Sequence, residues 1–359
     1  MADIQTQKDI ERLLFETGAI SVAPENKPFW YTSGTIGPYY SNTQNLIGGE
    51  AEANALLGFI DKGLRADKYM LPSMIMRRVA NAYKENACYH KVAEYIKICI
   101  NENVDIAEFD YISGGERRDW FFSYIAALLF HKPHITIYKD LSMVASIPFE
   151  GFGDTGDTGD AWGAGDAAAI PVEGGAYAGK RCLHVSDIIT EASSYARSWF
   201  PAVAKAGMKI CTSLTILDRM QGGGAVLDSL GIRHLSLARL DAPFFIRALE
   251  NGHINKRQHM LLHAYVANPN SAMRGFLIKN PEFLRDALRN GGKEAERARM
   301  CIESGVYGAA AAIAAKAATT ATAATAAAAD VATADATTAT AATADAAADT
   351  AFYKSKGPM

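Results

Sequence analysis

The stretch that decides the fold of this chain is CLHVSDIITEASS, residues 182–194. Its apolar start, residues 182–185, is long enough for one buried strand, and residues 190–194 are small and polar apart from one glutamate. Helical apolar spacing follows and ends at Gly207, a residue type that often terminates helices. A second apolar run covers residues 210–217 and is followed directly by Asp218 and Arg219. This order of strand, turn, helix and strand predicts a βαβ unit with two parallel, buried strands.

The turn between the first strand and the helix is predicted to bind an anion. Small residues at a helix start leave backbone N–H groups unpaired and pointing in one direction. The positive end of the helix dipole adds to their effect, and phosphate is the anion most often bound. Asp187 lies just before the turn, where its carboxylate suits sugar hydroxyls rather than the phosphate itself.

Three segments together resemble the orotate phosphoribosyltransferases, which are type I phosphoribosyltransferases. The stretch VSDIITEAS (185–193) resembles the loop that binds phosphoribosyl pyrophosphate (PRPP), although the family has an acid at Ser186 and a glycine at Ala192. The N-terminal stretches LLFETGAI (13–20), YTSG (31–34) and PYYSN (38–42) resemble the orotate-binding segment. LDR (217–219) followed by QGG (221–223) resembles the family's Leu-Asp-Arg-Gln-Glu-Gly stretch.

The resemblance implies an α/β fold of the type I phosphoribosyltransferase kind, with a mostly parallel, Rossmann-like sheet flanked by helices. The expected organisation is an N-terminal helix and a hood, a segment that covers the bound base, over residues 1–45, followed by a phosphoribosyltransferase core over residues 46–242. Composition adds a mobile Gly/Asp-rich loop at 149–179, a helical extension over 243–308 and a low-complexity Ala/Thr-rich tail over 309–359. Asp154, Asp157 and Asp160 in the loop fit a flexible acidic segment better than a calcium site, because no bidentate glutamate accompanies them.

The implied reaction is transfer of phosphoribosyl from PRPP to orotate, which gives orotidine 5′-monophosphate and pyrophosphate in pyrimidine nucleotide biosynthesis. The resemblance also implies Mg²⁺ bound through PRPP and a homodimer. The residues expected to bind PRPP are Ser186, Asp187, Thr190, Glu191, Ala192, Ser193, Ser194, Arg117 and Arg118. The residues expected near the base are Tyr39, Tyr40, Thr190 and Arg219. The residues expected to act in catalysis are Lys139, Arg118 and Asp187.

Each of these assignments has a structural alternative. Arg117 and Arg118 follow a predicted strand and two glycines, a setting that favours pyrophosphate binding, but they could instead form ion pairs at a solvated turn. Tyr40 could pack the hood on the core instead of contacting a base. Arg219 could form an ion pair with Asp218 at the end of its strand.

Departures from the family pattern keep other functions open. The second lysine and the histidine of the family's mobile catalytic loop fall on Ser142 and Val144. A binding or regulatory protein that holds PRPP without turnover is therefore a second hypothesis, and a phosphoribosyltransferase for another base is a variant of the first. A Rossmann-like nucleotide-binding enzyme is a third hypothesis, but no G-x-G-x-x-G motif follows a strand.

Composition excludes several classes of protein. The net charge is −3 and the sequence has no basic cluster, so it does not predict a surface that binds nucleic acid. The five cysteines are scattered without metal-ligand spacing, which indicates free thiols in a reducing compartment. The polar N-terminus is unlike a signal peptide, and no apolar run approaches membrane-spanning length. The sequence thus predicts a cytoplasmic protein without a membrane partner or a protein-bound metal.

Overall fold

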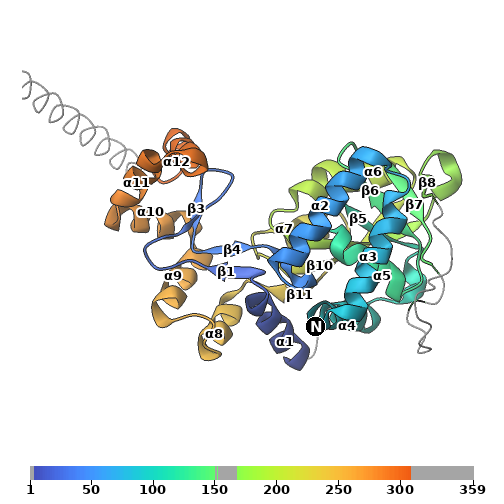
Figure 1. Cartoon of the computed structure of the whole chain (residues 1–359), viewed down its shortest axis with the longest axis horizontal. Helices are drawn as coiled ribbons and strands as arrows, with labels where there is room; N and C mark the ends of the chain where they lie inside the picture. Colours follow the sequence, from blue (N-terminus) through green and yellow to red (C-terminus); the bar gives the residue numbers. More distant parts are fainter. Residues whose placement is uncertain (1–3, 150–151, 153–167, 309–359) are drawn as a thin grey trace, which may run out of the picture. The chain divides into compact units, whose positions relative to one another are not determined.

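The computed structural model describes residues 4–149, 152 and 168–308, which belong to two compact units (Figure 1). The first unit comprises Met1–Ala23 and Tyr39–Val266, and the second comprises Pro24–Pro38 and Ala267–Met359. The acidic triplet 154–160, most of the expected Gly/Asp-rich loop and the Ala/Thr-rich tail lie outside the described residues.

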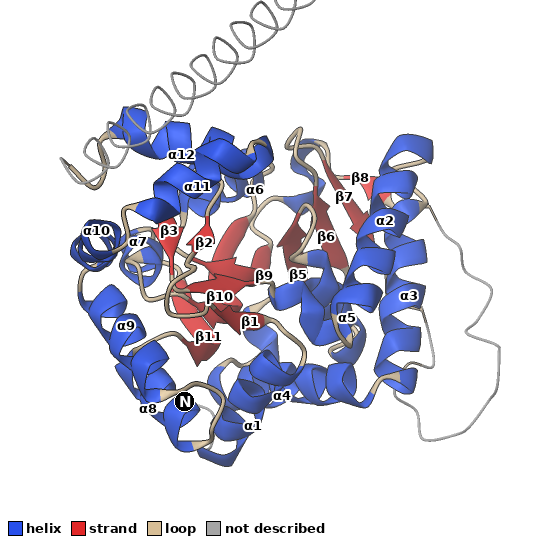
Figure 2. Ribbon diagram, turned by 60° about the vertical axis from the view of Figure 1, so that its left-hand side comes forward, coloured by secondary structure: helices blue, strands red, loops and turns tan. Residues whose placement is uncertain are grey.

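The first unit contains a seven-stranded sheet in the order β11-β10-β9-β5-β6-β7-β8, with helices around it (Figure 2). β5, β6, β9, β10 and β11 are mutually parallel, whereas β7 and β8 join antiparallel at one edge. The strands are β5 (Tyr111–Gly115), β6 (His134–Ile137), β7 (Met143–Ser146), β8 (Ile170–Pro171), β9 (Arg181–Ile189), β10 (Lys209–Asp218) and β11 (Arg233–Arg239). The predicted α/β class with a mostly parallel sheet is confirmed.

The predicted βαβ unit forms the centre of this sheet. β9 and β10 pair in parallel, with Val185 opposite Leu214. Between them the chain makes one π-helical turn (Tyr195–Trp199) and then the short helix α6 (Phe200–Lys205). Gly207 adopts φ +78°, the left-handed conformation that ends a helix at little steric cost to glycine.

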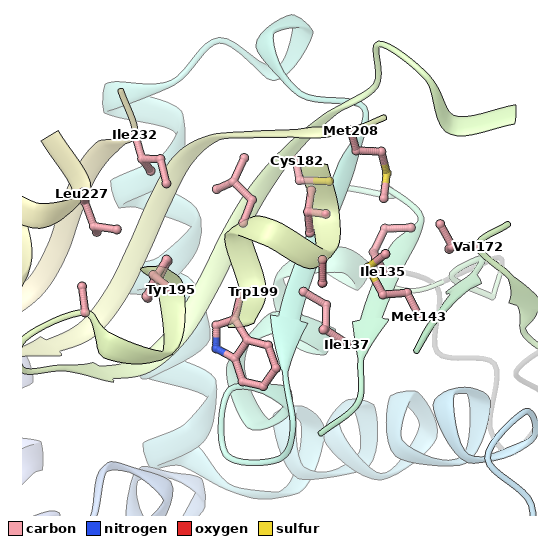
Figure 3. Close-up of a cluster of buried hydrophobic side chains, with 14 of the residues drawn as sticks. Ile135, Ile137, Met143, Val172, Cys182, Tyr195, Trp199, Met208, Leu227 and Ile232 are labelled. Carbon is pink, nitrogen blue, oxygen red and sulfur yellow. The ribbon is translucent and has the colours of Figure 1, made fainter. Parts of the chain in front are cut away.

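The core is formed by apolar side chains on the two faces of the sheet. On one face, the cluster in Figure 3 joins strand residues such as Ile137 and Cys182 to Trp199 and Val203 of the helical segment. The helix α5 (Trp120–Leu129) packs against β5 and β9, with Trp120 fully buried at its start. Burial of this apolar surface is the main force that fixes the strand ends relative to one another.

The remaining elements of the first unit surround the sheet. Gly18, at φ +67°, follows α1, and the β-rich segment at Tyr39 pairs with β1 and not with Phe29–Trp30. These elements are α1 (Ile4–Glu16), β1 (Ile20–Val22), β4 (Tyr39–Ser41), the 3₁₀ turn Thr43–Ile47, α2 (Glu50–Ala66), α3 (Leu71–Glu85), α4 (Ala87–Asn103), α5 (Trp120–Leu129), α7 (Gly223–Ser229), α8 (Ala242–Glu250) and α9 (Lys256–Ala267). Among the helices of the described residues, none has the length and apolarity needed to span a bilayer.

The second unit joins a small hairpin to three helices. β2 (Phe29–Trp30) pairs antiparallel with β3 (Ile36–Gly37), and the helices are α10 (Pro269–Lys279), α11 (Glu282–Asn290) and α12 (Gly292–Ser304). The Tyr307 hydroxyl contacts both the N–H and the carbonyl of Ile36, at 2.9 and 3.2 Å. Trp30 is buried and stacks on Phe283, as expected for a core residue. Residues 24–38 therefore belong to the same unit as the C-terminal helices.

Candidate functional site

The predicted site residues gather where four parallel strands end. The order of the sheet reverses between β5 and β9, because β6 follows β5 on one side while β10 and β11 extend β9 on the other. Ligand sites of open α/β sheets lie at the carboxyl ends of strands at such a reversal. Arg118 follows β5, Lys139 follows β6, the turn 190–194 follows β9 and Arg219 follows β10.

The turn 190–194 has the geometry expected of an anion site. Within the described part of the chain, no backbone acceptor receives a hydrogen bond from the N–H groups of residues 191–194. The carbonyl of Ala192 accepts from Ala196, so these N–H groups belong to the first turn of the helical segment. The side chains of Glu191, Ser193 and Ser194 are exposed, which keeps the Glu191 carboxylate away from the core.

A second loop, residues 219–223, supports this turn from the neighbouring strand. The Gly223 N–H donates to the Thr190 carbonyl at 2.9 Å, and the Arg219 N–H donates to the Ile189 carbonyl at 3.0 Å. A Cβ atom on Gly223 would lie 2.6 Å from Ile189 Cγ1 and 2.8 Å from the Thr190 oxygen. Only glycine permits this approach, so Gly223 helps to fix the position of the turn.

Asp187 is buried at the end of β9. Its carboxylate accepts a hydrogen bond from the Thr43 hydroxyl at 3.0 Å, and its N–H donates to Asp119 Oδ1 at 3.0 Å. Burial and the neighbouring Asp119 carboxyl raise the pKa of Asp187 to about 7, against the opposing effects of Arg118 and Thr43. A carboxyl group in this setting can gain or lose a proton near neutral pH.

The two arginines of the loop after β5 have different surroundings. Arg117 forms an ion pair with Asp61 of α2, which is a structural role. Arg118 is exposed and close enough to Asp187 to lower its pKa. The Lys139 N–H donates to the Glu116 carboxylate at 3.0 Å, so the loops after β5 and β6 are joined.

Arg219 and Tyr39 are brought together although they are far apart in the sequence. The Arg219 guanidinium lies 5.3 Å from the centre of the Tyr39 ring, and its Nε donates to the Tyr39 hydroxyl at 3.3 Å. Asp218 instead accepts from the Met220 N–H at 2.7 Å. Tyr39 is buried, with 2% of its surface exposed, while Tyr40 is half-buried.

Ser186 faces the interior and not the turn. Its hydroxyl contacts Thr215 at 3.2 Å and the Tyr195 hydroxyl at 3.0 Å. Successive strand residues point to opposite faces of a sheet, so Ser186 and Asp187 have separate surroundings. The serine is therefore part of a buried hydrogen-bond network beneath the helical segment.

Sequence reasoning missed three residues that contact the site or lie beside it. Asp119 accepts from Asp187, Thr43 donates to Asp187, and the His184 ring nitrogen Nε2 lies 3.7 Å from Asp119. Asp119 carried a signal, because it follows Arg118 on a loop already assigned to the site. Thr43 and His184 carried none that sequence spacing could reveal.

Ala192 provides a stability test of the turn. It has φ +53°, where a residue with a Cβ is strained by about 1–2 kcal/mol. We expect Ala192→Val to lower the free energy of unfolding by about 2 kcal/mol or more, because β-branched side chains fit this conformation worst. Ala192→Gly, the control, should change it by less than about 1 kcal/mol, since relief of strain and loss of a buried methyl group nearly cancel. Urea denaturation measures both, and a well-tolerated valine would contradict the assigned conformation.

Comparisons with known proteins find similarity in structure only. No family model matches the chain, and no curated protein matches it in sequence. Among solved structures, the UMP synthase of Leishmania donovani is 14% identical, with a TM-score of 0.44 over 73% of this chain and 42% of that one. The chain thus matches less than half of that protein. The orotate phosphoribosyltransferase of Francisella tularensis is 13% identical, with a TM-score of 0.43 over 71% of this chain and 95% of that one. The orotate phosphoribosyltransferase of Aeropyrum pernix is 18% identical, with a TM-score of 0.39 over 68% of this chain and 99% of that one.

Proposed function

We propose that this protein is a phosphoribosyltransferase that transfers the phosphoribosyl group of PRPP to orotate. One observation carries the proposal: the N–H groups of residues 191–194, which have no backbone acceptor in the described part of the chain, follow the buried Asp187 at the point where the sheet order reverses. One part suits a phosphate and the other suits sugar hydroxyls. A sugar phosphate has both groups, a few ångströms apart.

In this proposal the donor lies along the carboxyl ends of β9 and β5. The 5′-phosphate accepts hydrogen bonds from the N–H groups of residues 191–194 and from the hydroxyls of Thr190, Ser193 and Ser194. Asp187 accepts hydrogen bonds from the ribose hydroxyls. Arg118 and Lys139 follow neighbouring strands and face the pyrophosphate, where their positive charge stabilises the leaving group.

The base is placed from the other side, by Arg219. Its guanidinium can bind the carboxylate of orotate in a forked geometry while it remains stacked near Tyr39. The ring nitrogen of orotate attacks the anomeric carbon, the bond to pyrophosphate breaks, and pyrophosphate leaves with the electron pair. Orotate is acidic enough to need no strong base, so positioning and charge stabilisation are the main contributions of the protein.

In this proposal Mg²⁺ binds together with PRPP, the phosphoribosyl donor. In the described part of the chain, no cluster of three or more His, Cys, Asp or Glu side chains could hold a metal ion. The ion would therefore be chelated by the pyrophosphate and ribose oxygens, where it neutralises charge on the leaving group. Arg118 and Lys139 complement that neutralisation from the protein.

The test is turnover of PRPP and orotate with Mg²⁺, followed by the loss of orotate absorbance. The proposal expects magnesium-dependent loss of orotate with matching release of pyrophosphate. Adenine and guanine in place of orotate test the choice of base, since neither carries a carboxylate for Arg219. Tight PRPP binding without turnover of any base would contradict the transferase and support a protein that only binds the donor.

The second candidate, PRPP binding without turnover, is favoured by the segment after Lys139. Residues 143–146 form β7, which pairs with β6, and Val144 is only 1% exposed. Ser142 accepts a hydrogen bond from Lys68 at 3.3 Å. These residues are fixed in the sheet and offer no side chain that could protonate a leaving group.

A further inference from the structure

Tyr195 is a buried residue at the end of the turn that carries the proposed phosphate-binding N–H groups. It follows residues 191–194 directly and begins the π-helical turn Tyr195–Trp199 (Figure 3). The Ala196 N–H donates to the Ala192 carbonyl at 3.1 Å, so Tyr195 lies within the same hydrogen-bonded turn as those N–H groups. Tyr195 is only 3% exposed, so its side chain packs into the protein interior.

The Tyr195 hydroxyl joins this turn to two strands of the sheet. It donates a hydrogen bond to Ser186 Oγ on β9 at 3.0 Å and also hydrogen-bonds Ser213 Oγ on β10. A phenol has one hydrogen to donate, so Ser213 is the donor in the second bond. Ser186 is 3% exposed and Ser213 is fully buried. Both bonds are therefore shielded from competing water.

The partners of Tyr195 are held in place by further contacts. Ser186 donates to Thr215 Oγ1 on β10 at 3.2 Å, and Thr215 Oγ1 lies 3.2 Å from His234 Nε2 on β11. The network thus crosses three neighbouring parallel strands. The ring of His184 meets the ring of Tyr195 edge to face, with 4.9 Å between their centres. Tyr195 is therefore fixed both at its hydroxyl and at its ring.

Packing holds the other end of the same helical turn. Trp199 is buried, and a Cβ atom on Gly115 at the end of β5 would lie 2.4 Å from Trp199 Cε2. Apolar packing of this kind is not directional, whereas hydrogen bonds require a defined geometry. The orientation of the turn on the sheet is therefore set by the Tyr195 hydroxyl, which bonds the two central strands.

We propose that Tyr195 is a positioning residue for the phosphate of the donor. Its hydroxyl holds the turn so that the N–H groups of residues 191–194 point to the carboxyl end of β9. The inference rests on the proposed function, in which these N–H groups bind the 5′-phosphate. A set of donors binds an anion more tightly when it is already ordered in the free protein. Tyr195 is buried and acts on the ligand through the backbone of the turn.

Tyr195→Phe is expected to weaken the binding of PRPP and of ribose 5-phosphate by about 3- to 10-fold, the range typical of one hydrogen bond between neutral groups. The factor should be similar for both ligands, because they share the 5′-phosphate. The KM for orotate at saturating PRPP should stay within about twofold of wild type, because the proposed contact of orotate is with Arg219 and not with the turn.

The experiment is isothermal titration of the full chain with PRPP and Mg²⁺ and, separately, with ribose 5-phosphate. Tyr124→Phe is the matched control, because the buried Tyr124 of α5 hydrogen-bonds Thr136 of β6 at 2.6 Å. Each variant removes one buried hydroxyl that joins a helical segment to a strand. Both should unfold at lower urea concentration than wild type, but only Tyr195→Phe should lose affinity for the two ligands.

The outcomes distinguish failure of this inference from failure of the proposed function. Unchanged affinity for ribose 5-phosphate in Tyr195→Phe, or an equal loss in Tyr124→Phe, would overturn the positioning role and leave the proposed function standing. Absence of binding of both ligands to the wild type would overturn both. If Tyr195→Phe does not fold, Ser213→Ala decides, because it keeps the ring and removes one partner of the hydroxyl. Weaker binding of both ligands would then support the role, and unchanged binding would overturn it.

Discussion

Asp187→Asn is expected to lower the affinity for PRPP about 10- to 100-fold and to stabilise the free protein above pH 7. The loss of affinity follows from hydrogen bonds to a charged group, which contribute about 1.5–3 kcal/mol. The gain in stability follows from burial. Asp187 keeps its proton up to a pH of about 7 in the folded state but loses it near pH 4 when unfolded.

The sign of the pH effect is fixed by this difference. Between pH 4 and 7 the folded state binds more protons than the unfolded state, so the free energy of unfolding of the wild type falls as the pH rises. At about 1.4 kcal/mol per pH unit, the full effect is at most about 4 kcal/mol. Asparagine lacks this titration, so the stability of the variant relative to wild type should increase over the same range.

Urea denaturation at pH 4.5 and pH 8, together with donor titration at pH 8, measures both effects. Asp228→Asn on the surface of α7 should behave as wild type in both. Unchanged donor affinity in Asp187→Asn would remove Asp187 from the ribose site. A loss of affinity with no change in relative stability between the two pH values would contradict the burial of an ionised carboxylate.

Arg219→Gln is expected to raise the KM for orotate about 30- to 150-fold and to leave the affinity for PRPP within about twofold of wild type. A forked hydrogen bond to a carboxylate contributes about 2–3 kcal/mol, and glutamine has neither the charge nor the fork. The contact with Tyr39 is lost as well, but a cation–π contact of this kind contributes less than the forked hydrogen bond.

Steady-state kinetics with orotate and PRPP varied in turn separate the two substrates. Arg239→Gln is a matched control, because Arg239 lies opposite Asp218 at the end of the neighbouring strand and hydrogen-bonds Ser236. An equal loss for both substrates would show that Arg219 supports the whole site, and an unchanged KM for orotate would exclude it from the base site.

The sequence predicted the parts of this site that depend on local pattern. The apolar runs 182–185 and 210–217 became β9 and β10, and the small residues between them became the first turn of a helical segment. Parallel strands place their carboxyl ends at one edge, so the gathering of Arg118, Thr190 and Arg219 follows from topology. The opposite orientations of Ser186 and Asp187 also follow, from the alternation of side chains along a strand.

Contacts between side chains distant in sequence could not be predicted in the same way. The approach of Asp119 to Asp187 depends on where α5 begins relative to β5, within a fraction of a helical turn. Tyr39 pairs with β1, and its ring is buried against Phe245 and Tyr265. These contacts depend on how the whole unit packs, which composition and periodicity do not predict.

The central claim is that the N–H groups of residues 191–194 bind the phosphate of a phosphoribosyl donor. A crystal structure of the protein grown with PRPP and Mg²⁺ tests it most directly. We predict the 5′-phosphate oxygens at about 2.7–3.2 Å from those nitrogens, with the ribose hydroxyls at Asp187. A donor bound elsewhere on the protein, or a turn that stays empty at saturating PRPP, would contradict the account.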